Sequence, residues 1–110
     1  MSYTISEEKK FSNNQQAVAE AIKRVANDLG GKLVKKGKVE CVVFSKKMLG
    51  KVLGEQTRVE YNLESSDSET TVKITAYPLD AIGNKLMFGA RKGVTRQVVD
   101  HFFEYLAKNL

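Results

Sequence analysis

Two neighbouring segments alternate between apolar and polar side chains, and this alternation constrains the fold more than any other feature of the sequence. Residues 57–64 and 69–77 each place an apolar side chain at nearly every second position, so one face of each extended segment is apolar. The Ser-Ser-Asp-Ser sequence between them is typical of a turn. We therefore predict a β-hairpin with one apolar face, and such a face requires a second layer of structure to cover it.

Two helical segments near the ends of the chain can supply that layer. In residues 13–29 and 94–109, apolar side chains recur about every three to four positions, which is the period of an amphipathic helix. Ser12 and Gln15 match a capping box at the start of the first helix, and the pair of glycines after Leu29 provides a stop. We predict that each helix buries its apolar stripe against the sheet.

Further extended segments complete the sheet. They are predicted at residues 3–10, 32–36, 38–45 and 85–88. Pro78 cannot donate a backbone hydrogen bond, so it either ends the second strand of the hairpin or lies at an edge. We expect residues 1–110 to form one α+β domain, a two-layer sandwich in which both helices pack on one face of an antiparallel sheet of roughly four to six strands.

This order of elements resembles a shortened helix-grip, or START-like, domain, and it is also similar to other helix-on-sheet folds such as the TATA-binding-protein-like fold. The helix-grip resemblance implies a curved sheet that holds the last helix and leaves a cavity between the two. That cavity would be lined by Tyr61, Ile74, Phe88 and Phe102, and residues 48–53 could act as its lid. The alternative function that follows is an apolar small-molecule or lipid carrier.

Positive charge is concentrated in two segments of the chain, whose net charge is +5. Residues 32–51 contain seven lysines and one glutamate, and residues 85–96 contain four basic residues and no acidic one. Residues 53–84 carry a net charge of −4. Segregated charge of this kind favours an acidic or phosphate-bearing partner, provided that the fold does not pair the two signs within the molecule.

The sequence FGARKGVTRQ at residues 88–97 is the main candidate for an anion-binding site. Backbone N–H groups at the start of a helix attract anions, glycines let a phosphate approach closely, and basic side chains add charge-assisted hydrogen bonds. With the lysines of residues 45–55, the site would comprise Gly89, Arg91, Lys92, Gly93, Thr95, Arg96, Lys46, Lys47 and Lys51. The structural alternative is that Gly89 ends a strand, Gly93 permits a tight entry and Thr95 caps the helix.

Residues 45–55, SKKMLGKVLGE, combine lysines with apolar side chains. As a short amphipathic helix, this segment could lie on an anionic membrane surface or meet a protein partner. As a connection between strands, its apolar residues would complete the core.

The sequence gives little support for catalysis or metal binding. Cys41 and His101 are the only cysteine and histidine, so no disulfide can form within the chain and no cysteine–histidine cluster is available for zinc. Cys41 lies in an apolar segment, where cysteine usually acts as a small hydrophobic residue. We expect no metal, no cofactor and no enzymatic activity.

The N-terminal sequence MSYTISEEKK lacks the apolar region of a signal peptide. No stretch of the chain is apolar over the roughly 18 residues that a membrane-spanning helix needs. We expect a cytoplasmic, non-enzymatic binding module whose partner is nucleic-acid phosphate, a phosphorylated metabolite or an acidic protein.

Overall fold

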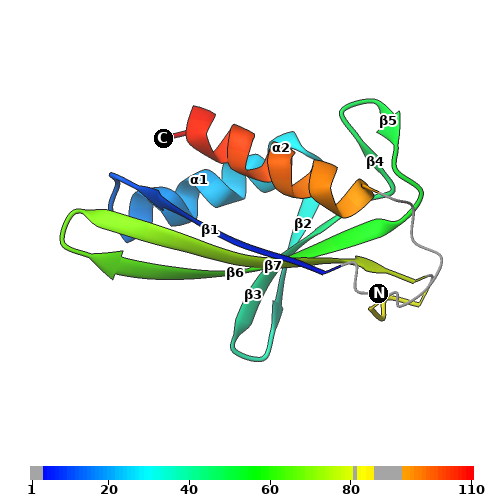
Figure 1. Cartoon of the computed structure of the whole chain (residues 1–110), viewed down its shortest axis with the longest axis horizontal. Coiled ribbons are helices and arrows are strands. Elements are labelled where there is room, and N and C mark those ends of the chain that lie inside the picture. The colour runs from blue at the N-terminus through cyan, green and yellow to red at the C-terminus, as the bar shows by residue number, and fades with distance from the viewer. Residues whose placement is uncertain (1–3, 81, 86–92) are drawn as a thin grey trace.

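The computed structural model describes residues 4–80, 82–85 and 93–110 of the chain (Figure 1). The elements along these residues are, in order, β1 (Ile5–Phe11), α1 (Gln15–Asp28), β2 (Gly31–Lys36), β3 (Val39–Phe44), β4 (Lys47–Met48), β5 (Lys51–Val52), β6 (Gln56–Ser66), β7 (Glu69–Leu79) and α2 (Val94–Lys108).

Among the described residues, five strands form an antiparallel sheet in the order β1-β7-β6-β3-β2, and β4 and β5 form a separate pair. β6 and β7 are the hairpin predicted from the alternating segments, and they pair from Gln56 opposite Leu79 to Ser66 opposite Glu69. The edge strand β1 pairs with β7, although the two are far apart in sequence. The predicted α+β class, with an antiparallel sheet and two helices, is confirmed.

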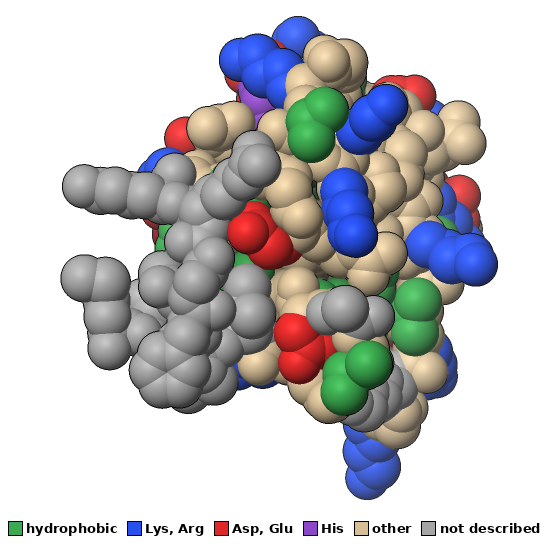
Figure 2. Space-filling model, turned by 90° about the vertical axis from the view of Figure 1, so that its right-hand side faces the viewer, with side chains coloured by type: hydrophobic (Ala, Val, Ile, Leu, Met, Phe, Trp, Pro, Cys, Tyr) green, Lys and Arg blue, Asp and Glu red, His purple; other side chains and the backbone are tan. Residues whose placement is uncertain are grey.

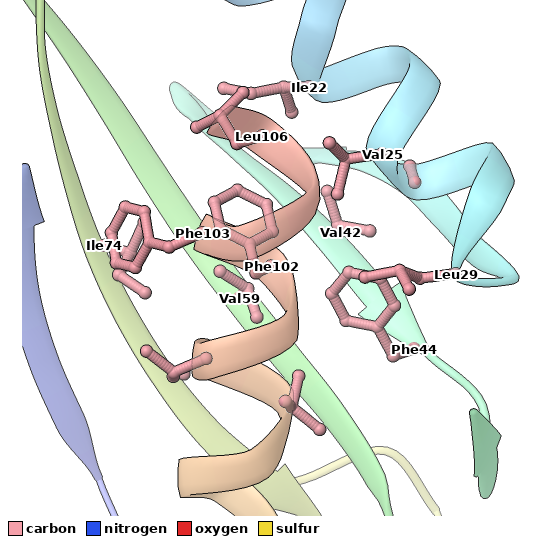
Figure 3. Packing of buried hydrophobic residues seen from close by; sticks show 14 of the residues in the cluster. Ile22, Val25, Leu29, Val42, Phe44, Val59, Ile74, Phe102, Phe103 and Leu106 are labelled. Atoms are coloured by element: carbon pink, nitrogen blue, oxygen red, sulfur yellow. The ribbon is translucent and has the colours of Figure 1, made fainter. Parts of the chain in front are cut away.

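One hydrophobic cluster joins the sheet to both helices (Figure 3). Val42, Val59 and Ala76 are neighbours across β3, β6 and β7, and all three are fully buried. The apolar stripes of α1 and α2 belong to the same cluster, and the helices also contact each other (Figure 1). The helix residues buried there are Val18, Ala21, Ile22, Val25, Ala26, Val94, Val98, Val99, Phe102, Phe103 and Leu106.

The start of α1 differs from the prediction. Asn14, not Ser12, caps the helix, and its side chain accepts a hydrogen bond from the backbone N–H of Ala17 at 2.7 Å. The side chain of Gln15 instead accepts a hydrogen bond from the hydroxyl of Ser65 at 2.8 Å. The predicted capping box is therefore wrong, because a tertiary contact with β6 uses the glutamine.

The segment that leads into α2 also differs from the prediction. Gly93 precedes the helix with a left-handed φ of 83° and provides no side-chain cap. Thr95 is buried in the first turn, so the capping role considered for it is wrong. Lys85 forms an isolated bridge with Leu79, while the rest of that predicted strand, residues 86–88, lies outside the described residues.

The two glycines after α1 have separate roles. Gly30 has a left-handed φ of 72°, which ends the helix as predicted. Gly31 already belongs to β2, where a Cβ atom would lie 2.6 Å from Cγ1 of Val42 and 2.7 Å from Cε1 of Phe44. Phe44 is the cross-strand neighbour of Gly31, so its ring occupies the space that a side chain would need.

Pro78 lies within β7, one residue before its end. It is opposite Thr57 of β6, whereas the described part of β1 pairs with β7 only as far as Ala76. β7 therefore ends one residue after the proline, and Pro78 lies beyond the residues of β7 that pair with the described part of β1.

Candidate functional site

The β4–β5 hairpin is a short strand pair at one end of the molecule (Figure 1). Leu49 and Gly50 both have positive φ, 51° and 80°, which is typical of a two-residue hairpin turn. Met48 and Leu53 are 3% and 5% exposed, and the N–H of Leu53 donates to the carbonyl oxygen of Lys46 at 2.6 Å. The helix considered for this segment is therefore wrong, and the hairpin is anchored in the core by Met48 of β4 and by Leu53, which follows β5.

Lys46, Lys47 and Lys51 are exposed on this hairpin. None of them forms an ion pair with an acidic residue in the part of the chain that the structure describes. Lys46 and Lys47 line a shallow depression together with Ser45 and Gln56. The face of the molecule in Figure 2 carries basic, acidic and separate hydrophobic side chains. The fold thus places three of the predicted anion-binding residues on one short hairpin.

Arg96, another residue of the predicted site, contacts acidic side chains of its own chain. Its Nη2 atom lies 2.7 Å from Oε1 of Glu7, and its Nε atom lies 3.4 Å from Oδ1 of Asp100. These two carboxylates offset the charge of the guanidinium, so Arg96 is less available to an external anion than the hairpin lysines are. The other residues proposed around it, Gly89, Arg91 and Lys92, lie outside the described residues.

The residues predicted to line an apolar cavity belong to the packed core where they are described (Figure 3). Ile74 is 3% exposed and Phe102 is fully buried. The ring of Phe102 packs edge to face against Phe44 and Phe103, with centroid distances of 6.4 and 5.6 Å. These rings fill the space between α2 and the sheet around Ile74. Phe88 lies outside the described residues.

Tyr61, the remaining residue of the predicted cavity, lies at the margin of this core. It is partly buried and packs against the hydrophobic cluster. Burial raises the pKa of its phenol above the ordinary value of 10.0, and the neighbouring Glu40 carboxylate on β3 raises the pKa further. The hydroxyl of Tyr61 therefore remains protonated well above neutral pH.

A polar network that the sequence did not predict lies on one face of β6 and β7. This face is opposite to the one that carries the buried Val59 and Ala76. The Tyr77 hydroxyl donates to Oε2 of Glu60 at 2.8 Å and accepts from Nη1 of Arg58 at 3.1 Å. The Nη2 atom of Arg58 lies 3.5 Å from the carbonyl oxygen of Gly83, and Nζ of Lys85 lies 5.2 Å from the centre of the Tyr77 ring. Burial raises the pKa of Tyr77, so this phenol stays a neutral donor. The alternating pattern identified the polar face, but the contact with Tyr77 depends on the strand register.

The described residues contain no group of three or more histidine, cysteine, aspartate or glutamate side chains that could hold a metal ion. Cys41 is buried in β3, and its Sγ atom lies 3.2 Å from the carbonyl oxygen of Val34. His101 lies in α2. Within the described ranges, no helix has the length and apolar character needed to cross a membrane.

Comparison with known proteins identifies the fold but not a family. No family model matches the sequence, and no curated protein matches it by sequence. Among solved structures, the chain is similar to Ara h 8.0201, with a TM-score of 0.52 and 10% identity over 99% of this chain and 98% of that one. At this level of identity, the similarity shows a shared α+β fold and nothing about function.

Two further solved structures are more distant. One is the biotin acetyl coenzyme A carboxylase synthetase from Helicobacter pylori with bound biotinylated ATP, with a TM-score of 0.46, 10% identity and 97% of this chain covered. The chain spans 50% of the length of that synthetase. The other is TTHA0849 from Thermus thermophilus, with a TM-score of 0.44 and 13% identity over 96% of this chain and 92% of that one.

Proposed function

We propose that the chain is a non-enzymatic binding module in which both helices cover one face of the sheet and the β4–β5 hairpin binds a phosphate-bearing ligand or partner. One observation carries this proposal. Lys46, Lys47 and Lys51 are exposed on a single hairpin, without an ionic partner among the described residues.

The anchoring of the hairpin in the core supports the same assignment. Because Met48 and Leu53 are buried on either side of the turn, the backbone that carries the lysines is held in place before any ligand arrives. Cations on a preorganised hairpin lose less entropy on binding than cations on a flexible loop do. Its attraction for phosphate is long-ranged and decreases with salt.

A matched pair of charge variants tests this function. The triple variant Lys46→Gln, Lys47→Gln and Lys51→Gln removes the hairpin charge. The control variant Lys32→Gln, Lys35→Gln and Lys38→Gln removes an equal charge from exposed positions of the β2–β3 hairpin. We expect a short RNA oligonucleotide to cause salt-sensitive nitrogen–proton shifts at residues 46–52 in the wild type and the control, but not in the first variant. Equal binding by all three proteins would refute the assignment of this surface.

A second candidate function, an apolar-ligand carrier, has one observation in its favour. The Thr57 side chain is fully buried, and its hydroxyl has no hydrogen-bond partner among the described residues. A ligand with a polar group could satisfy that hydroxyl, although the packing of Ile74 and Phe102 leaves little space near them. Native mass spectrometry of the purified protein tests this candidate. A carrier would retain an apolar molecule, and Thr57→Val would reduce the retained fraction. Release of no such molecule after denaturation would count against it.

A further inference from the structure

We propose that the β4–β5 hairpin docks on the surface of a bilayer that contains anionic phospholipids. In this arrangement Leu49 and Val52 enter the interfacial region, and the hairpin lysines contact the lipid phosphates. This inference rests on the proposed function, because it identifies the phosphate-bearing partner of the same surface as a membrane.

The first argument is the apolar character of the hairpin tip. Leu49 is 47% exposed at the turn, and Val52 is 61% exposed beside it. Val52 is the cross-strand partner of Lys47, so an apolar and a cationic side chain lie next to each other on the outward side. Ile82, which is 82% exposed, lies on a turn that follows β7. Such a mixture of aliphatic and basic side chains matches the boundary between lipid headgroups and acyl chains.

The second argument is the kind of hydrophobic side chain that is exposed. Binding to single-stranded nucleic acid generally uses exposed aromatic rings that stack on the bases. In the described part of the chain, every large hydrophobic side chain that is exposed is aliphatic: Leu33, Val34, Val39, Leu49, Val52 and Ile82. The exposed side chains are therefore better suited to a lipid bilayer, in which acyl chains lie behind a layer of phosphates, than to the stacked bases of a nucleic acid.

The third argument is the contrast with the β2–β3 hairpin, which also combines lysines with exposed aliphatic residues. Its turn consists of Gly37 and Lys38, so lysine would be the side chain placed deepest in a bilayer. Its exposed Val34 and Val39 lie on one face of the two strands and Leu33 lies on the other, so these aliphatic side chains are in the strands and not at the turn. The β4–β5 hairpin has Leu49 at its turn instead, so only this hairpin presents an apolar tip.

Vesicle flotation tests the proposal with matched variants. The probes are vesicles of phosphatidylcholine alone and vesicles of phosphatidylcholine and phosphatidylserine in equal proportion. We expect the wild type to float only with the anionic vesicles, and Leu49→Ser with Val52→Ser to weaken binding about tenfold. The control, Val34→Ser with Val39→Ser, changes residues of similar exposure and should bind like the wild type. Each lysine-to-glutamine change in the β4–β5 hairpin should weaken binding about fivefold.

The outcomes separate this inference from the proposed function. If the wild type does not float but RNA causes lysine-dependent shifts at residues 46–52, membrane docking is overturned and anion binding stands. If the serine pair floats as well as the wild type, insertion of the tip is overturned. If neither vesicles nor RNA bind, both proposals fail. Equal thermal midpoints for all variants would show that the comparison is not affected by unfolding.

Discussion

Arg96 and Glu7 form an ion pair that connects the first turn of α2 to the edge strand β1, with 2.7 Å between Nη2 and Oε1. Two residues further along β1, Nζ of Lys9 lies 5.0 Å from the centre of the Phe103 ring of α2. Both β1 side chains occupy the same side of the strand as Ile5, whose neighbour Ala76 is buried. Inward-facing charged residues are a common way to keep an edge strand from pairing with other chains.

Glu7→Gln should lower the free energy of unfolding only slightly, by less than about 1 kcal/mol, because both partners of the ion pair are partly exposed. The effect should shrink further in high salt. Urea denaturation at low and high salt measures it. Glu8→Gln is the control, because the side chain of Glu8 points to the other face of β1. A loss of several kcal/mol that persists in high salt would contradict this expectation.

Gly31→Ala should destabilise the fold by about 1 to 3 kcal/mol, since the new methyl group would overlap Val42 and Phe44, both fully buried. Combining it with Phe44→Leu should cost less than the sum of the two single changes, because the smaller side chain leaves room for the methyl group. Thermal or urea unfolding of the two single variants and the double variant gives the coupling free energy between the two changes. Strict additivity would mean that the ring does not occupy the space beside Gly31.

Thr57→Val and Thr70→Val should change stability in opposite directions, although both threonines are fully buried. The Thr57 hydroxyl has no hydrogen-bond partner among the described residues, so its removal should stabilise the protein by about 1 kcal/mol. The Thr70 hydroxyl donates to the carbonyl oxygen of Asn13 at 2.7 Å, so its removal should destabilise the protein by about 1 kcal/mol. Urea denaturation compares the two, and destabilisation by Thr57→Val would reveal an interaction of that hydroxyl.

The stability of the protein should decrease at alkaline pH in a way that depends on Tyr61. Burial and Glu40 raise its pKa in the folded state above the ordinary value of 10.0, so the folded protein keeps a proton that the unfolded chain loses. The contribution of Tyr61 to the free energy of unfolding is therefore fully present at pH values below the ordinary pKa of 10.0. It is lost as the pH rises from that value toward the pKa of the folded state. In the Tyr61→Phe variant, the free energy of unfolding should decrease less steeply with rising pH. The measurement is urea denaturation of both proteins across this pH range, and parallel curves would argue against the raised pKa.

The alternating segments predicted the β6–β7 hairpin because side-chain periodicity is a local property of the sequence. The capping box failed because Ser12 and Asn14 are both good capping residues. The choice between them depends on distant contacts, such as the bond from Ser65 to Gln15. The pairing of Arg96 with Glu7 was equally inaccessible, since it requires the register of β1 on β7 as well as the position of α2.

The pairing of β1 with β7 also sets an order of events during synthesis. Ile5 pairs with Ala76, so β1 leaves the ribosome well before the strand that it pairs with. β6, β7 and their turn can form while β1 is still without a partner, because their contacts are local. Closing the long loop between β1 and β7 carries the larger entropic cost. We therefore expect β1 to pair with β7 late in folding. Until then, the unpaired edge of β7 should be accessible to chaperones.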